Sequence, residues 1–218
     1  MDPLSDQLAC DCVAGYARRN YAALDKFLEE QLARPVDVVY AESLLVPNVR
    51  GLDGVDLVIG KFSEVVADAG RIELPVRPIA MLSDADGSVT QAGLFVVRTD
   101  DGAKSIEDIK DYRVLIGPVE SDEKHSAALA AFEAFGLPTA DDIPTSSGCS
   151  SVALAVVEKD ADVAVISGYA MPLLEGCGTI DKGALRILAE TDRVPFIGLF
   201  FTNRIDAKSG QDIRAALA

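Results

Sequence analysis

The chain alternates short apolar runs with stretches in which apolar residues recur every three or four positions. The first pattern is typical of buried β-strands and the second of amphipathic helices. Residues 15–32, for example, place Leu24, Leu28 and Leu32 on one helical face. The predicted strands are 8–13, 37–40, 56–60, 76–82, 88–98, 113–117, 162–167, 185–189 and 196–202. The predicted helices are 15–32, 63–69, 104–110, 121–135, 152–157, 169–174 and 212–217.

Strands that alternate with helices in this way predict an α/β protein with mainly parallel sheets and helices on both faces. The stretch 88–98 lies near the middle of the sequence, and the same alternation precedes and follows it. We therefore predict that it crosses between two lobes with a ligand cleft between them. Ligands of such sheets bind at the carboxyl ends of the strands. The loops at those ends are 10–15, 60–63, 117–124, 146–151 and 167–169.

Composition narrows the classes of partner. The chain has 218 residues, 49% of them hydrophobic, and a net charge of −15. An acidic surface repels nucleic acid, so we expect no nucleic-acid partner. No apolar run reaches the length of about 18 residues that a membrane-spanning helix needs, so we expect no membrane insertion. The sequence has no Gly-rich nucleotide loop and no Gly-x-Ser-x-Gly motif, and we expect neither a cofactor nor an enzyme. We also expect a monomer.

Hydroxyl side chains gather in the predicted strand-end loops. Lys61 follows a predicted strand directly, which makes it the strongest candidate for the counter-charge of an anion; a surface lysine is the alternative. Ser121 is predicted to cap a helix, whose N-terminus also suits an anion. His125 is predicted to be a solvated helix residue. The predicted ligand-binding residues are Cys10, Cys12, Lys61, Ser63, Ser88, Thr90, Glu120, Ser121, Ser146, Ser147, Cys149 and Tyr169.

The four cysteines leave several interpretations open. Cys10 and Cys12 are two positions apart, so in a strand both thiols face the same side. They could be two small buried residues, a strained disulfide, or thiols that face the cleft. Cys149 and Cys177 could form a disulfide. Alternatively, Cys149 joins Cys10 and Cys12 in a three-thiol site for copper(I) or zinc, or the Cys10–Cys12 pair cycles between dithiol and disulfide as a redox protein.

Several segments stand in a characteristic order and spacing along the chain. These segments are Asp56–Gly60, Gln91–Arg98, Lys104–Lys110, Arg113–Gly117, Ser150–Val157 and Asp162–Ile166. In this order they resemble the family of the phosphate/phosphonate ABC-transporter substrate-binding proteins, over most of the chain from about residue 8 to the C-terminus. No single motif carries the resemblance, which lies in the order of the segments.

The resemblance implies a type 2 periplasmic-binding fold that captures a small polar or anionic ligand by hinge closure. It implies hinge strands near 88–93 and 191–195, one lobe of 1–90 with 193–218, and a second lobe of 91–192. It also implies an ABC permease as partner and an extracytoplasmic location, although the sequence shows no signal peptide. Where the family opens its phosphonate-binding helix with Thr/Ser-Ser-Gly-type residues, this chain has Glu120 to Lys124. Cys149 stands near the position of a ligand-facing histidine of the family.

Overall fold

The computed structural model describes residues 2–5, 19–50, 54–84, 86–137, 143–146 and 148–217, without the side chains of Asn48 and Arg50. The chain forms two compact units. Unit 1 comprises Met1–Val89 and Pro195–Ala218, and unit 2 comprises Thr90–Val194. None of the helices in the described ranges is long and apolar enough to cross a membrane.

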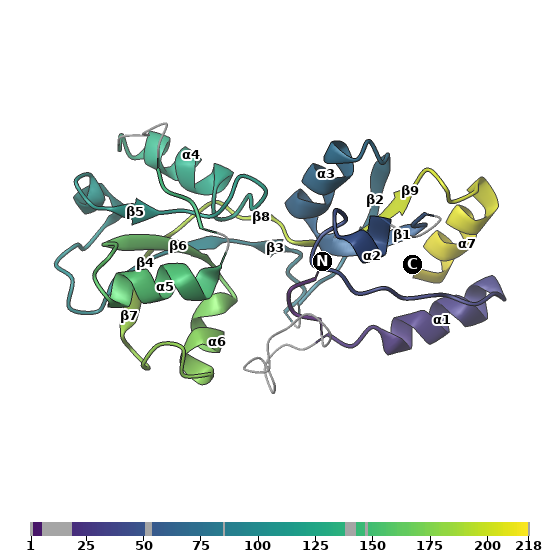
Figure 1. The fold of residues 1–218 in the computed structure, drawn as a ribbon, viewed down its shortest axis with the longest axis horizontal. Helices are drawn as coiled ribbons and strands as arrows, with labels where there is room; N and C mark the ends of the chain where they lie inside the picture. Colours follow the sequence, from purple (N-terminus) through teal and green to yellow (C-terminus); the bar gives the residue numbers. More distant parts are fainter. Residues whose placement is uncertain are drawn as a thin grey trace. The chain divides into compact units, whose positions relative to one another are not determined.

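Unit 1 is built on a three-stranded sheet in the order β1-β9-β2. The strands are β1 (Leu57–Lys61), β2 (Val76–Met81) and β9 (Ile197–Thr202). The helices are α1 (Ala22–Leu32), α2 (Pro47–Arg50), α3 (Phe62–Arg71) and α7 (Ala207–Leu217) (Figure 1). Because side chains alternate along a strand, Phe200 packs with Val65 of α3 on one face of β9, and Phe201 packs with Leu28 and Ile213 on the other.

Unit 2 is built on a four-stranded sheet in the order β5-β6-β4-β7. The strands are β4 (Gly93–Arg98), β5 (Val114–Leu115), β6 (Val163–Ser167) and β7 (Leu185–Glu190). The helices are α4 (Ser126–Ala134), α5 (Cys149–Val157), α6 (Ala170–Gly176) and a 3₁₀ helix, Ile106–Ile109. Figure 1 shows α4 on one face of the sheet and α5 and α6 on the other.

Side chains of β4 belong to the apolar clusters on both faces of the sheet of unit 2. Leu94 and Val96 belong to an apolar cluster that includes Val152 and Val156 of α5. Phe95 and Val97, which point to the opposite face, belong to a cluster that includes residues of α4 and the 3₁₀ helix. A strand that is buried on both faces reads as a continuous apolar run. This is why the predicted runs match β4, β6 and β9 within a few residues.

The predicted two-lobed α/β class is confirmed, but the described strand pairings are not mainly parallel. In the sheets of three and four strands, only β5 and β6 pair in parallel; β4 is antiparallel to β6 and β7, and β9 is antiparallel to β1 and β2. The reason is that β4 and β9 directly follow the two crossings of the chain. Gly93, at the start of β4, pairs with Ser167, at the end of β6, and Ile197 pairs with Lys61 in the same way. Each crossing therefore enters its sheet at the carboxyl ends of neighbouring strands.

The two crossing segments pair with each other. Strand β3 (Thr90–Gln91) lies beside β8 (Val194–Pro195), and the units divide at these strands. Arg193 reinforces the pair, because its guanidinium donates to the Thr90 hydroxyl at 2.9 Å and to the Thr90 carbonyl at 2.7 Å. These are the segments in which the resemblance predicts the hinge.

Several local predictions differ from the structure. The helix predicted from residue 15 begins at Ala22 in the described part of the chain. The predicted strand 37–40 is not a strand, and Val38 and Val39 are 44% and 45% exposed. Helix α7 begins five residues before the predicted helix. Ser105 is the N-cap residue of the 3₁₀ helix and forms a reciprocal capping box with Asp108.

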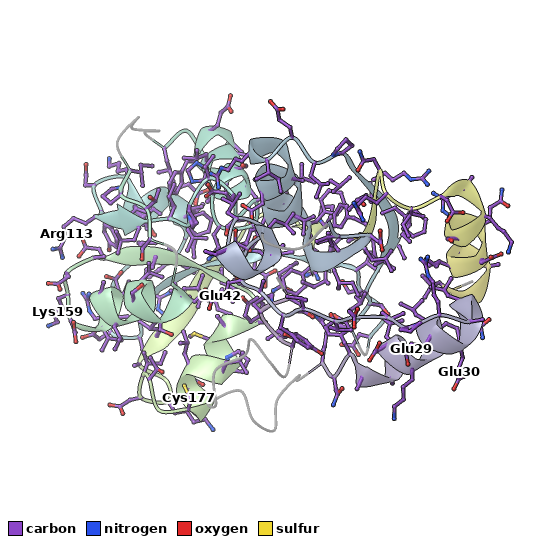
Figure 2. All side chains as sticks on the ribbon, turned by 45° about the vertical axis from the view of Figure 1, so that its right-hand side comes forward. Glu29, Glu30, Glu42, Arg113, Lys159 and Cys177 are labelled. Atoms are coloured by element: carbon purple, nitrogen blue, oxygen red, sulfur yellow. The ribbon has the colours of Figure 1, made fainter. Side chains whose placement is uncertain are left out.

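The Arg113–Asp162 ion pair of unit 2 predicts acid sensitivity. The Arg113 guanidinium donates to both carboxylate oxygens of Asp162, from Nε at 3.0 Å and from Nη2 at 2.9 Å, and Nη2 also donates to the carbonyl of Lys159 at 2.7 Å (Figure 2). The hydrogen bonds from Arg113 lower the pKa of Asp162 from 3.8 to about 2. A depressed carboxylate pKa contributes stability above the unfolded value, and this stability is lost as the pH falls through the folded value.

We expect Asp162→Asn to lower the free energy of unfolding by about 1 kcal/mol at pH 6, because the pair is partly exposed to solvent. The difference from the wild type should shrink as the pH falls from about 4 toward about 2. Chemical denaturation at a series of pH values measures it. Asp212→Asn is the control, because its partner Lys208 is 3.9 Å away and exposed. A difference that stays constant down to the lowest pH would contradict the assignment.

Candidate ligand-binding site

Lys61 ends β1 in unit 1 and is the N-cap residue of α3. Helix α3 starts directly after Lys61, and not at Ser63 as predicted, because the N–H of Phe62 donates to the carbonyl of Phe196 at 2.7 Å. Lys61 is 3% exposed, and its ammonium lies 3.0 Å from the carboxylate of Glu64. Lys61 thus lies at the predicted end of a strand, and its charge is shared with a carboxylate of the same helical turn. Ser63 is half-buried beside it.

In unit 2, the loop after β5 folds into a closed turn. The carbonyl of Ser121 accepts from the N–H groups of Lys124 and His125, both at 2.9 Å. The N–H of Gly117 donates to the Lys124 carbonyl at 3.0 Å, and a ring nitrogen of His125 lies 2.8 Å from the Gly117 carbonyl. Helix α4 therefore begins at Ser126, with His125 as N-cap. The predicted cap at Ser121 is wrong, because these backbone bonds hold Ser121 in the preceding turn.

Four side chains of unit 2 form what we call the polar chain: Lys124, Cys149, Ser167 and Glu123. The Lys124 ammonium lies 4.0 Å from the Cys149 sulfur, which lies 3.8 Å from the Ser167 hydroxyl. Ser167 in turn donates to the Glu123 carboxylate at 2.7 Å. Glu123, Lys124 and Ser167 are 1%, 5% and 0% exposed. The polar chain joins the loop after β5, the end of β6 and the start of α5.

Two glycines permit this close packing. A Cβ atom at Gly93 would overlap the carbonyl of Glu123, and one at Gly117 would overlap the side chain of Lys124. Thr191 fastens the same region, because its hydroxyl accepts from the Gly93 N–H at 2.8 Å and donates to the Glu123 carbonyl at 3.3 Å. The turn that carries Glu123 and Lys124 therefore rests directly on the backbone of β4.

The turn before α5 contributes more hydroxyl groups. The hydroxyls of Ser146 and Ser151 lie 3.0 Å apart, and Ser151 also donates to the carbonyl of the N-cap Gly148 at 2.8 Å. Cys149 is the first residue of α5, which begins three residues before the predicted helix. Cys149 and Cys177 are both free, so the disulfide between them that the sequence left open is not formed.

The remaining predicted residues make local contacts. The N–H of Ser88 donates to Asp84 at 2.8 Å, and the Thr90 hydroxyl accepts from Arg193. Tyr169 is the N-cap residue of α6. Glu120 is half-buried in the loop after β5. Cys10, Cys12 and Ser147 lie outside the described residues.

Of the predicted ligand-binding residues that the structure describes, Cys149 belongs to the polar chain. Lys61, Ser63 and Ser88 belong to unit 1, whereas Thr90, Glu120, Ser121, Ser146, Cys149 and Tyr169 belong to unit 2. Within the described ranges, no three Cys, His, Asp or Glu side chains are placed to hold a metal ion. The three-thiol site needs Cys10 and Cys12 and stays an untested alternative.

The sequence prediction did not single out Glu123, Lys124, Ser167 and Thr191, which the structure brings together in and beside the polar chain. If the carboxylates of the 120–124 segment are treated as free charges, they argue against the binding of an anion beside this segment. The structure shows instead that Glu123 is buried and bound to Ser167. One feature of the sequence could have indicated Ser167. It is a hydroxyl residue at the end of an apolar strand, and such a residue lies where parallel sheets bind ligands.

The comparisons with known proteins agree with this architecture. The family model of the phosphonate periplasmic substrate-binding proteins of ABC transporters matches residues 16–218. The chain therefore belongs to this family and is a substrate-binding protein of the ABC-transporter type. No protein with a curated description matches the sequence.

Solved structures show the same fold at low sequence identity. PhnD1 from Prochlorococcus marinus, in complex with methylphosphonate, is 17% identical, with a TM-score of 0.66 over 99% of this chain and 80% of that one. XAC2383 from Xanthomonas citri, bound to ATP, is 18% identical, with a TM-score of 0.66 over 90% and 77% of the two chains. The aliphatic sulphonate binding protein SsuA from Escherichia coli is 17% identical, with a TM-score of 0.67 over 90% and 65%. The predicted type 2 periplasmic-binding fold is thereby confirmed.

Proposed function

We propose that this protein captures a small oxyanion of the phosphonate class and delivers it to an ABC permease outside the cytoplasm, without chemical change. The match of residues 16–218 to the phosphonate-binding family carries the proposal. The structure supports it through the polar groups at the carboxyl ends of the strands, where α/β sheets bind ligands. A protein with a net charge of −15 can still bind an anion, because short-range hydrogen bonds act locally.

Both units contribute to the proposed site. Lys61 and Ser63 come from the end of β1 and the start of α3, and Ser88 comes from the approach to β3. Unit 2 contributes Thr90, Glu120, Ser121, Ser146, Cys149 and Tyr169, and the sequence adds Cys10, Cys12 and Ser147, which lie outside the described residues. We add Lys124 as a positive charge, because its buried ammonium lies at the end of the polar chain. Hydroxyl and N–H groups supply the hydrogen bonds that an oxyanion accepts.

Binding closes the two units about the crossing segments. Unit 1 is the first proposed lobe and unit 2 the second, with the ligand cleft between them. Strands β3 and β8 are short and lie at the division of the chain, so small changes in their dihedral angles suffice for hinge closure. A ligand shifts the equilibrium toward the closed form only by the contacts that it makes better there. Groups from both units are therefore required for tight binding.

A ligand panel tests the function. We expect methylphosphonate to raise the melting temperature and to bind in isothermal titration calorimetry, because a ligand of the folded state stabilises that state. Ethanesulfonate, inorganic phosphate and ATP complete the panel, since similar folds occur with sulphonate and ATP. A stronger response to ethanesulfonate or to ATP than to methylphosphonate would change the proposed ligand class to sulfonates or to nucleotides. A panel in which no oxyanion binds, with well-folded protein, would contradict the proposal.

A further inference from the structure

Unit 1 contains a long groove between two stretches of backbone, and the groove shares no residue with the proposed oxyanion site. One side is formed by eight consecutive residues, 34–41, and the other by six consecutive residues, 54–59. The second side includes the first three residues of β1. Helix α1 ends at Leu32, and the segment 34–41 then runs back along it (Figure 1). The groove therefore has the form of a gap between two neighbouring strands.

Both sides of the groove have open backbone edges. Strand β1 lies at the edge of its sheet, because β9 is its only partner among the described strands. In an antiparallel pair, every second residue of a strand points its N–H and C=O groups away from the partner. On the other side, residues 37–40 make no backbone hydrogen bond to the part of the chain that the structure describes. Such open edges are templates for another strand, because backbone N–H and C=O groups need partners.

Apolar side chains cover the groove on both faces of the sheet. Leu44 lines the groove on one face and belongs to the apolar cluster of Val58. Leu28 lines it on the other face and belongs to the cluster of Leu57. The plane of the sheet separates the two layers, so one small molecule cannot fill both. A β-strand can, because its successive side chains point to opposite faces.

The segment 34–41 is fixed near both ends, so the groove keeps its width. Near its start, the N–H of Val36 donates to the carboxylate of Glu29 on α1 at 3.1 Å (Figure 2). Just after its end, the Ser43 hydroxyl donates to the carboxylate of Asp68 on α3 at 2.6 Å. Asp68 is itself 6% exposed. This side of the groove is thus tied to two helices of the same unit.

Asp2 lies at the end of the groove where α1 begins. It lines the groove together with Ser5, and it accepts from the hydroxyl of Tyr21, the N-cap residue of α1, at 2.5 Å. The Arg19 guanidinium donates to the same carboxylate at 3.1 Å, and Asp2 is 2% exposed. The ion pair and the tyrosine hydroxyl thus anchor Asp2 at this end of the groove.

The two sides of the groove run in the same direction, toward Asp2. Helix α1 leads away from Asp2, so the segment 34–41, which runs back along the helix, approaches Asp2 again (Figure 1). Strand β1 ends on the same side. The N–H of Phe62, directly after β1, donates to the carbonyl of Phe196 at 2.7 Å, and the Arg19 guanidinium lies 5.8 Å from the centre of the Phe196 ring. A strand that fills the groove and ends at Asp2 is therefore parallel to both sides.

We propose that the groove is a binding slot for one further β-strand, which the polypeptide directly before Asp2 supplies. The strand pairs in parallel with β1 on one side and with residues 37–40 on the other. Six residues of a strand span about 20 Å, which matches the six residues of the side 54–59. A strand that is covered on both faces is apolar throughout and contains no proline. The high strand propensity of Val38 and Val39 fits this pairing.

Hydrogen exchange tests the proposal on the full chain with a six-residue extension, Lys-Val-Val-Ile-Val-Val, fused before Met1. The matched control extension is Lys-Val-Pro-Ile-Pro-Val, because proline lacks the N–H group that a central strand needs. We expect the first extension to slow the exchange of the amides of residues 37–40 and 57–59 by about tenfold or more. It should also raise the urea midpoint of unfolding by about 1 M, because it buries further apolar surface. The control extension should change neither quantity.

The other outcomes would overturn the proposal. Unchanged exchange with the first extension, or equal effects of the two extensions, would show that the added residues do not pair as a strand. Slow exchange of residues 57–59 in the unextended chain would mean that the slot is already filled, for example by residues 8–13, which lie outside the described residues. Protection that appears only in a dimer, as size-exclusion chromatography detects it, would assign the slot to a second copy. Methylphosphonate takes no part in this test, so its failure would leave the transport proposal in place.

Discussion

Gly93→Ala is expected to lower the free energy of unfolding by about 3 kcal/mol, since a group forced into a packed site displaces its neighbours. The new Cβ would overlap the Glu123 carbonyl and lie 3.0 Å from the Val165 side chain. The backbone carbonyl cannot move aside as the end of a flexible side chain can. The turn that carries Glu123 and Lys124 would shift away from β4, and methylphosphonate affinity should fall with it.

Urea denaturation and calorimetry with methylphosphonate measure the two effects. Gly102→Ala is the matched control, because nothing lies within 4 Å of its Cβ position and it is exposed. The control should change the free energy of unfolding by less than about 0.5 kcal/mol. A Gly93→Ala variant as stable as the control would show that the turn can yield, and would refute the tight packing of Glu123 on β4.

The sequence predicts the buried framework well because burial leaves a direct pattern. Strands β4, β6 and β9 are apolar up to their last residues, Arg98, Ser167 and Thr202, and all residues of β6 and β9 are buried. The segment 37–40 shows the limit of this rule. Val38 and Val39 have high strand propensity, but a strand also needs a neighbour to pair with, which propensity does not report. Because propensity does not report pairing, the sequence also does not show that β4 and β9 run antiparallel to their neighbouring strands.

Helix starts and the polar chain depend on contacts between distant segments. Serine is a favoured N-cap, yet α3 begins after Lys61, because Phe196 supplies the first acceptor from far along the chain. The bond between Ser167 and Glu123 likewise joins residues 44 positions apart. Local sequence shows that Ser167 ends a strand and that Glu123 lies in a charged turn. It does not show that the two meet.

The largest effect on ligand binding is expected from Lys124→Met, which keeps the length of the side chain and removes its charge. Lys124 is 5% exposed and ends the polar chain. Removing one charge from a buried, hydrogen-bonded site typically costs about 2–5 kcal/mol of binding free energy. We therefore expect methylphosphonate affinity to fall by a factor of about 100 or more, measured by calorimetry. Lys61→Met should have a smaller effect, because Glu64 already shares the Lys61 charge.

Three controls separate charge from fold. Lys124→Arg keeps the positive charge and should retain more affinity than Lys124→Met, although the wider guanidinium will not fit equally well. Lys182→Met removes an exposed lysine from the same unit and should leave binding unchanged. Melting temperatures without ligand identify variants that fail to fold. If folded Lys124→Met binds methylphosphonate as the wild type does, Lys124 is not the counter-charge. If Lys61→Met alone abolishes binding, that role belongs to Lys61, as the sequence first indicated.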